Sequence, residues 1–320
     1  MIVRNALIGA LLAACSATVF ARYPERPVRV VVGFSPGGPT DVVARAFASY
    51  ASEALGQTFV VENKPGANTI LAAEAVAKAP GDGYTLLMGA TNHSMIPALY
   101  ANRITFDALK SFTPLCTVAV SPTVLTVSPA LNVATYDAFL TRARAQPGRM
   151  TAATPGTGSS GHFATEQFMR LTHTTLNPIP YKGAAQAVSD LMGGQVDSSF
   201  ATLGSVLPQL SSGKLIALAV AAPQRLPQLP DVPTFDEAGL HGYDADAWYG
   251  VLAPAGLPAD IRHTLEEVAR NFAQASETAK RFDVLGMQPR HVCGAAFETQ
   301  LGGEIASYGK LATDLGLKAD

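Results

Sequence analysis

Strand and helix signals alternate along this chain in two successive sets, and this alternation constrains the fold more than any other feature. Short apolar runs bounded by Gly, Pro and Asn indicate strands, and apolar residues at helical spacing indicate helices. After the first unit, the predicted strands are 59–61, 84–88, 150–153, 178–180, 196–201 and 215–221, and the predicted helices are 70–78, 135–145, 163–171, 184–192, 205–210, 259–274, 276–285 and 296–315. We therefore expect an α/β protein in which each domain is a mostly parallel sheet flanked by helices.

Two β-rich segments are expected to join the two domains. The first is Thr117–Val127, and the second, Trp248–Leu252, follows an irregular proline-rich connection. A chain that crosses twice divides into domain 1, at residues 22–122 and 248–320, and domain 2, at residues 123–247. Two hinge strands allow such domains to open and close on a ligand.

The first strand–turn–helix unit, Val30–Tyr50, has the features of a ligand-binding turn. An apolar strand is followed by Gly37 and Gly38, and then by a segment with apolar residues at helical spacing. Glycines let a ligand approach the main chain closely, and the start of a helix favours an anion. We interpret this turn as half of a binding site. The alternative is that the glycines only permit a tight turn, while Thr40 and Asp41 cap the helix.

Composition and charge exclude several classes of function. Of the 320 residues 48% are hydrophobic, and the 23 basic and 25 acidic residues are spread without blocks, so no basic stripe for nucleic acid is present. The six histidines are His93, His162, His173, His241, His263 and His291. Because no two of them stand three or four residues apart, we expect no metal site and no cofactor.

The first residues have the pattern of an export signal. A positive start precedes a short apolar run at 6–14, and small residues end at Ala21, where we expect cleavage. No later apolar run reaches the ~18 residues of a membrane span, so the mature protein is expected to be soluble and exported. Leu12–Cys15 resembles a bacterial lipobox, which leaves open a lipidated Cys15 that tethers the protein to a membrane.

Two cysteines, Cys116 and Cys293, remain after export. An exported protein can form disulfides. Two thiols far apart in sequence are nevertheless more often isolated buried residues, so we expect these two to be unpaired.

Several motifs resemble those of one family, in the family's order over nearly the whole mature chain. They are Tyr23–Pro27, Ser35–Asp41, Val61–Ala67, Gly81–Thr85, Pro180–Gly183, Gly193–Asp197 and Leu229–Thr234. All are similar to the Bug (TctC-type) substrate-binding proteins of tripartite tricarboxylate transporters. The resemblance implies a two-domain periplasmic-binding-protein (type II) clamshell, and we expect the protein to be a monomer and not an enzyme. Such a protein captures a small organic acid in the periplasm and presents it to the membrane permease subunits.

The resemblance also implies that main-chain N–H groups of two turns hold the ligand's carboxylate. The site residues expected in these turns are Phe34, Ser35, Pro36, Gly37, Gly38, Thr40 and Asp41, and then Gly156, Thr157, Gly158, Ser159, Ser160 and His162. Neither turn contains an arginine, so two opposed helix starts would bind the carboxylate through backbone donors.

Further residues stand at the ends of predicted strands and are expected at the same site. Thr91 and Asn92 follow the third strand, where they either line the pocket or bond locally as turn residues do. Tyr181 with Gly183, and Thr202 with Ser205, have equivalent positions in domain 2. For Asp41, a cap is the preferred role over contact with a substrate ammonium group, and for Trp248 a place in the hinge core is preferred over stacking on a ligand.

Two other functions were weighed. Gly156-x-Gly158-x-x-Gly161 matches the dinucleotide fingerprint in letters, but Asn177–Tyr181 offers no acidic residue for a ribose. Ser160 and His162 do not form a Gly-x-Ser-x-Gly elbow, so we expect no catalysis. A periplasmic partner that senses a ligand and signals to another protein would use the same clamshell, and the sequence does not distinguish it from a transport receptor.

Overall fold

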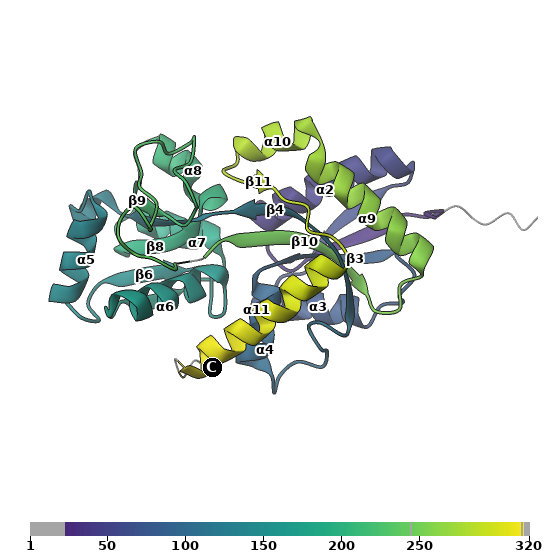
Figure 1. The fold of residues 1–320 in the computed structure, drawn as a ribbon, viewed down its shortest axis with the longest axis horizontal. Helices are drawn as coiled ribbons and strands as arrows, with labels where there is room; N and C mark the ends of the chain where they lie inside the picture. The colour runs from purple at the N-terminus through teal and green to yellow at the C-terminus, as the bar shows by residue number, and fades with distance from the viewer. Residues whose placement is uncertain (1–22, 244, 315, 317–320) are drawn as a thin grey trace, which may run out of the picture.

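The computed structural model describes residues 23–243, 245–314 and 316, and these form two lobes, each built on one sheet (Figure 1). We call the six-stranded sheet with its helices lobe 1 and the five-stranded sheet with its helices lobe 2. The expected signal segment, its cleavage after Ala21 and the lipidation alternative at Cys15 lie outside the described residues.

Lobe 1 contains a mixed sheet with the strand order β11-β4-β10-β3-β1-β2. Strands β2, β1 and β3 are parallel, whereas β10 is antiparallel to both β3 and β4. The strands are β1 (Val28–Val32), β2 (Phe59–Asn63), β3 (Thr85–Ala90), β4 (Phe112–Ser121), β10 (Ala247–Pro254) and β11 (Gln288–Pro289). The helices are α2 (Pro39–Leu55), α3 (Ile70–Ala77), α4 (Asn92–Tyr100), α9 (Ala259–Gln274), α10 (Ser276–Asp283) and α11 (Ala295–Asp314), with a 3-10 turn η1 (Ala67–Thr69).

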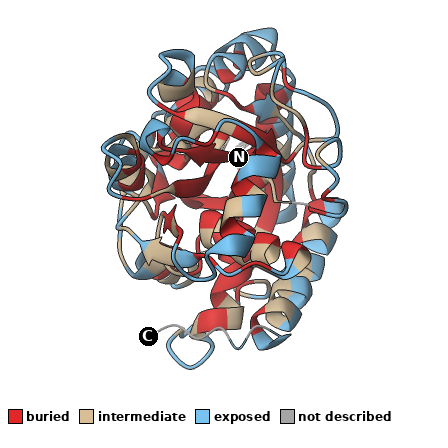
Figure 2. Cartoon of the chain, turned by 90° about the vertical axis from the view of Figure 1, so that its left-hand side faces the viewer, coloured by how far each residue is buried: buried red, intermediate tan, exposed pale blue. Residues whose placement is uncertain are grey.

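Helices cover both faces of this sheet. Successive residues of a strand point to opposite faces, so both sets of side chains are buried. Val30 and Val32 pack with α2 and α9 on one face, while Val31 packs with α3 and α11 on the other. Figure 2 shows the buried strands enclosed by helices whose outer residues are exposed. A strand buried on both faces requires the continuous apolar run that the sequence shows at this point.

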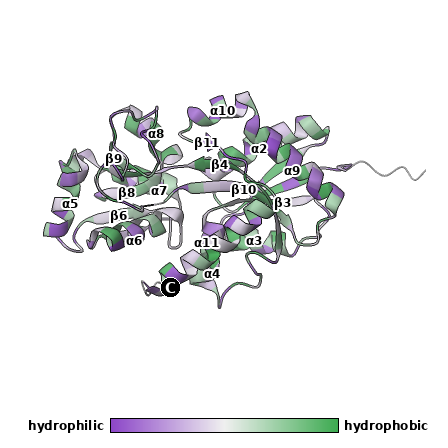
Figure 3. Cartoon of the chain, viewed as in Figure 1, coloured by the Kyte–Doolittle hydropathy of each residue, from purple (hydrophilic) through white to green (hydrophobic). Residues whose placement is uncertain are grey.

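Lobe 2 repeats this arrangement with the strand order β7-β6-β8-β5-β9. Strands β7, β6 and β8 are parallel, and β5 is antiparallel to its neighbours β8 and β9. The strands are β5 (Thr123–Val127), β6 (Thr151–Thr154), β7 (Asn177–Pro180), β8 (Ser198–Thr202) and β9 (Ile216–Val220). The helices are α5 (Tyr136–Ala145), α6 (Ser160–Thr172), α7 (Ala184–Met192) and α8 (Leu203–Ser211), with a 3-10 turn η2 (Pro129–Leu131). Figure 3 shows hydrophobic and hydrophilic residues alternating along these covering helices, as expected of elements buried on one side.

Two strands connect the lobes side by side. Strand β4 continues through Pro122 into β5 of lobe 2, and β10 returns from lobe 2 antiparallel to it (Figure 1). In this pairing Trp248 stands opposite Val120 and is almost fully buried. The crossing strands make both sheets mixed, because β10 is antiparallel to β3 and β4, and β5 is antiparallel to β8 and β9. The domain bounds 22–122, 123–247 and 248–320 stay a prediction.

Cys116 and Cys293 form a disulfide, so the expectation of two unpaired thiols is wrong. Cys116 lies in β4, and the backbone on either side of Cys293 runs antiparallel to that strand, with the Thr117 amide donating to the Val292 carbonyl at 2.9 Å. This pairing brings the two Cα atoms to 4.0 Å although the residues are 177 positions apart. Nothing local to either cysteine reveals a contact that only the folded sheet creates.

Candidate functional site

A cavity of about 710 Å³ lies between the two lobes, in the size range of small-molecule sites. Lobe 1 contributes Gly33–Ser35, Pro36, Gly38–Thr40, Pro65–Thr69, Ala90–Asn92, Tyr100, Ala247 and Tyr249. Lobe 2 contributes Pro155–Thr157, Ser159–Gly161, Tyr181–Ala185, Phe200, Thr202 and Ser205. The carboxyl ends of the parallel strands of both sheets therefore converge on one space, as they do in open α/β sheets that bind ligands.

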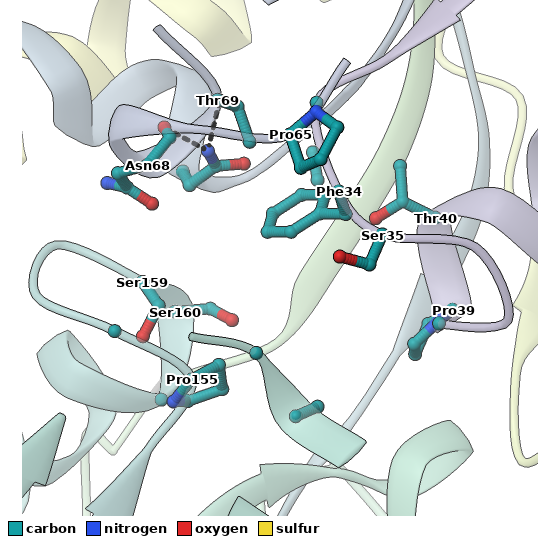
Figure 4. Close-up of a pocket in the computed structure, with 18 of the residues that line it drawn as sticks. Phe34, Ser35, Pro39, Thr40, Pro65, Asn68, Thr69, Pro155, Ser159 and Ser160 are labelled. Carbon is teal, nitrogen blue, oxygen red and sulfur yellow. Dashed lines mark hydrogen bonds between the residues drawn. The ribbon is translucent and has the colours of Figure 1, made fainter. Parts of the chain in front are cut away.

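The first wall is the turn that joins β1 to α2. Gly38 precedes the helix in an extended conformation, and no side chain among the described residues caps this helix start. Helix geometry leaves the N–H groups of the first turn without acceptors inside the helix, and Pro39 has none to offer, so the donors are those of Thr40 and Asp41. Figure 4 shows Ser35 and Thr40 together on this side of the cavity.

The opposite wall is the turn that joins β6 to α6. Ser159 precedes the helix, and its hydroxyl accepts a hydrogen bond from the His162 amide at 3.3 Å. Gly156 and Gly158 both have positive φ, at 133° and 76°, which only glycine adopts readily. Figure 4 shows Ser159 and Ser160 across the space from Ser35 and Thr40. The two helix starts thus face one cavity from different lobes.

Other helices also begin at the cavity. Lining residues stand at or next to the first residues of α3, α4, α7 and α8. Each helix start carries about half a positive charge from the aligned peptide dipoles. Among the described lining residues, no side chain is acidic and Lys182, an exposed residue, is the one cation. The potential in the cavity therefore favours an anion, and most of it comes from the backbone.

The structure places most of the predicted site residues in the lining. Phe34, Ser35, Pro36, Gly38, Thr40, Thr91, Asn92, Gly156, Thr157, Ser159, Ser160, Tyr181, Gly183 and Thr202 all line the cavity. The other four, Gly37, Asp41, Gly158 and His162, are not lining residues and instead hold the two turns in shape.

Asp41 is buried and fully engaged with protein partners. Its carboxylate accepts hydrogen bonds from the Gly37 amide at 2.9 Å, from Arg45 Nε at 2.9 Å and from Asn63 Nδ2 at 2.9 Å. Burial opposes its ionisation, but these donors and the Arg45 charge hold the pKa of Asp41 below its usual value. It therefore fixes the first turn to α2 and β2, and does not cap the helix from its own first turn.

His162 has a similar role in the second turn. Its Nδ1 accepts a hydrogen bond from the Gly158 amide at 3.1 Å, which places the ring proton on Nε2, 3.6 Å from Glu166 Oε1. Burial lowers the pKa of His162 and raises that of Glu166. A neutral His162 thus maintains the turn through a backbone contact.

Thr91 and Asn92 both line the cavity and bond locally. Thr91 Oγ1 accepts from the Trp248 amide at 2.8 Å, which ties the end of β3 to hinge strand β10. Asn92 Nδ2 donates to Thr69 Oγ1 at 2.6 Å and to the Asn68 carbonyl at 3.2 Å. Thr91 and Asn92 therefore have both of the roles considered from the sequence, lining the pocket and forming local hydrogen bonds.

The segment Pro65–Thr69 was not among the predicted site residues, although it lines the cavity. Ala67, Asn68 and Thr69 all have positive φ, at 45°, 50° and 71°, which is unusual for three consecutive residues other than glycine. Such backbone strain gathers at ligand sites and switch regions. The sequence signal for this segment was its position directly after a predicted strand, within the motif Val61–Ala67.

Two hydrogen bonds cross the cavity from lobe 1 to lobe 2. Asn68 Nδ2 donates to the Gly158 carbonyl at 3.1 Å, and the Tyr100 hydroxyl donates to the Thr157 carbonyl at 3.3 Å. Phe163 of α6 also packs with Met95, Leu99 and Tyr308 of lobe 1, its ring centroid 5.1 Å from that of Tyr308. The described conformation therefore has the lobes in contact on the side of α4 and α11.

Fold and site together define a two-lobed α/β binding protein with its ligand cavity between the lobes. The model of the tripartite tricarboxylate transporter family receptor, TctC, matches residues 43–317, so the chain belongs to this family. It is 35% identical to Protein BugT of Bordetella pertussis over 268 residues, which cover 83% of this chain and 82% of BugT.

Two solved structures are similar along almost the whole chain. R. palustris Rpa4515 with adipate has a TM-score of 0.86 and 33% identity, covering 93% of this chain and 100% of that one. MatC from Rhodopseudomonas palustris with bound malate has a TM-score of 0.83 and 31% identity, covering 90% of this chain and 99% of that one. The α/β binding-protein fold and the resemblance stated from the sequence motifs are confirmed.

Proposed function

We propose that this protein is an extracytoplasmic receptor that captures a small carboxylate between its lobes and delivers it to a tripartite tricarboxylate transporter. The observation that carries the proposal is the pair of helix starts, α2 with Gly38 and α6 with Ser159, that face one cavity from different lobes. Backbone N–H groups at a helix start bind carboxylates through charge-assisted hydrogen bonds.

The charge of the lining supports an anionic ligand over an amino acid. An amino acid would bring an ammonium group, and the described lining residues include no carboxylate to pair with it. The adipate and malate named for the two similar structures are carboxylates as well. A site of this kind needs no bond-making chemistry, so we propose that the ligand is released unchanged.

The proposed location is the periplasm, with the permease subunits as partners. The family is one of transporter receptors, and the export signal predicted at the N-terminus supports passage through the inner membrane. Among the described residues, no helix is both long and apolar enough to cross a lipid bilayer. Delivery requires release, and two hinge strands provide the motion that opens the cavity.

The test is to purify the protein from periplasm, release its bound small molecule and identify that molecule by mass spectrometry. A carboxylate is expected, and adding it back should raise the melting temperature with concentration as mass action requires. Incubation should then return it chemically unchanged. A neutral or cationic ligand, or conversion of the carboxylate to a product, would contradict the proposal.

A further inference from the structure

Most polar side chains in the cavity already bond to other parts of the protein. Thr69 and Asn92 bond to each other, and Thr91 accepts the Trp248 amide. Asn68 uses its amide donor on the Gly158 carbonyl. Because a group that is satisfied by the protein gives up a bond when it turns to a ligand, these residues are weak candidates for holding a second polar group.

The polar groups near the hinge are engaged in the same way. Thr202 at the end of β8 shares a hydrogen bond between hydroxyls with Ser205 of α8. Thr202 also bonds to the hydroxyl of Tyr249 on β10, whose pKa is raised by burial. This small network joins the two lobes beside the hinge, and its hydroxyls are taken up by one another.

The side-chain hydroxyls without a protein partner gather at the two helix starts. Among the described lining residues, Ser35 and Thr40 on one side and Ser160 on the other make no side-chain hydrogen bond within the protein. They stand beside the backbone donors of α2 and α6, as Figure 4 shows. The unpaired side-chain hydroxyls named here are thus concentrated at the two facing helix starts, in position to surround one anionic group.

The remaining lining is apolar. Phe34 and Pro65 lie together on the lobe 1 side, and Pro155 lies opposite on lobe 2 (Figure 4). Ala184, Phe200 and Ala247 add further carbon surface. A second carboxylate placed against these side chains would lose its hydration without gaining a side-chain donor from them, and the one cation, Lys182, remains exposed to water.

We propose that the cognate ligand has a single carboxylate and an apolar body of hydrocarbon or aromatic carbon, so that its second end requires no charge recognition. This inference rests on the proposed function and narrows its substrate class. The carboxylate binds between the two helix starts, and the body packs against Phe34, Pro65 and Pro155. Burial of carbon surface then contributes to affinity in addition to the anion contacts.

The test compares hexanoate with adipate by isothermal titration calorimetry of the ligand-free mature protein. The two acids share a six-carbon chain and differ in the second carboxylate. Hexanoate is expected to bind at least tenfold more tightly than adipate. Adipate binding as tightly as hexanoate, or more tightly, would overturn the inference and leave the proposed function standing. Failure of both acids, with no stabilisation by any carboxylate, would overturn the proposed function and this inference with it.

Two variants test whether Phe34 recognises the apolar body of the ligand. Phe34→Ala should weaken hexanoate binding at least fivefold, whereas Val284→Ala, at an exposed apolar residue outside the cavity, should leave it unchanged. Unchanged hexanoate affinity in Phe34→Ala, or an equal loss in Val284→Ala, would contradict recognition through an apolar body.

Discussion

Asn68 Nδ2 lies 3.1 Å from the Gly158 carbonyl oxygen, and this hydrogen bond joins the two lobes across the candidate site. Both partners occupy left-handed backbone conformations, with φ of 50° and 76°. At Gly158 the close approach leaves no room for a side chain, because an added Cβ would lie 2.8 Å from Asn68 Nδ2 and 2.6 Å from Leu99 Cδ1. The left-handed segment that contains Asn68 and the glycine turn that contains Gly158 are therefore complementary in shape.

Replacing Asn68 by Asp should open the unliganded protein. Aspartate keeps the shape of the side chain and tolerates the left-handed conformation, but it replaces the donor by an oxygen that repels the Gly158 carbonyl. We expect a larger radius of gyration by small-angle X-ray scattering without ligand. Asn132→Asp is the matched control, since Asn132 is also left-handed and its amide donates to the Ala130 carbonyl within lobe 2. Equal radii for both variants would show that the bond does not hold the lobes together.

Truncating Phe163 should weaken ligand binding from a distance. Phe163 is buried between α6 and the helices α4 and α11 and does not line the cavity. Phe163→Ala removes apolar contact between the lobes, so the closed state becomes less populated and apparent affinity falls in proportion. We expect a three- to tenfold rise in Kd by calorimetry.

Phe139→Ala serves as the comparison, because Phe139 is equally buried but packs only within lobe 2. Both truncations should lower the free energy of unfolding by about 3 kcal/mol, as buried Phe→Ala changes do. The prediction fails if Phe139→Ala raises Kd as much as Phe163→Ala does.

Removing the disulfide should destabilise lobe 1 without changing the site. The bond closes a loop of 177 residues, and chain entropy assigns such a loop about 5 kcal/mol of unfolding free energy. The double variant Cys116→Ala, Cys293→Ala should therefore unfold at a lower urea concentration, with unchanged affinity for the ligand. A midpoint equal to that of the parent protein would show that backbone pairing of Cys293 with β4 already supplies this constraint.

Stability should decrease in acid because of His93. Its ring is buried, with Nε2 2.7 Å from the Ala108 carbonyl, and burial lowers the pKa of His93 from 6.5 to about 4. Between these values the unfolded chain binds a proton that the folded protein excludes, so the free energy of unfolding falls as pH falls. The full loss is about 3 kcal/mol at 1.36 kcal/mol per pKa unit.

The measurement is urea unfolding of the parent protein and of His93→Gln at several pH values from 7 to 4. Glutamine can still donate to the Ala108 carbonyl but does not titrate, so its curve should fall less steeply through this window. Parallel curves for the two proteins would exclude His93 as the source of the acid sensitivity.

The sequence predicts elements whose signals are local. The run Val30–Val32 and the periodic helix after Gly38 appear in the structure at these positions because strand and helix periodicity are properties of neighbouring residues. The two turns at the cavity follow from the same signals, since parallel strands end at a common edge.

Features that depend on distant partners were not predicted. Helix α4 begins at Asn92 within a polar segment and contains Pro97, so its local pattern is that of a turn; contacts with α11 stabilise it. The left-handed conformation of Ala67–Thr69 depends on Asn92 and Gly158, which lie 23 or more residues away. The mixed strand order of lobe 1 requires the return of β10 beside β4, and the disulfide requires the segment around Cys293 to pair with the other side of β4.

The most direct test of the central claim is the ligand Kd of Gly38→Val. Gly38 has an ordinary φ of −79°, and an added Cβ would meet only the Ser35 carbonyl at 3.8 Å, so valine fits the fold while covering the α2 helix start. Gly193→Val is the control, because Gly193 also has a negative φ and ordinary Cβ space but lies outside the cavity. With both variants folded by circular dichroism, we expect Gly38→Val to raise Kd about 100-fold, or ~2.7 kcal/mol, and Gly193→Val to leave it unchanged. An unchanged Kd in Gly38→Val would contradict the account that this helix start holds the carboxylate.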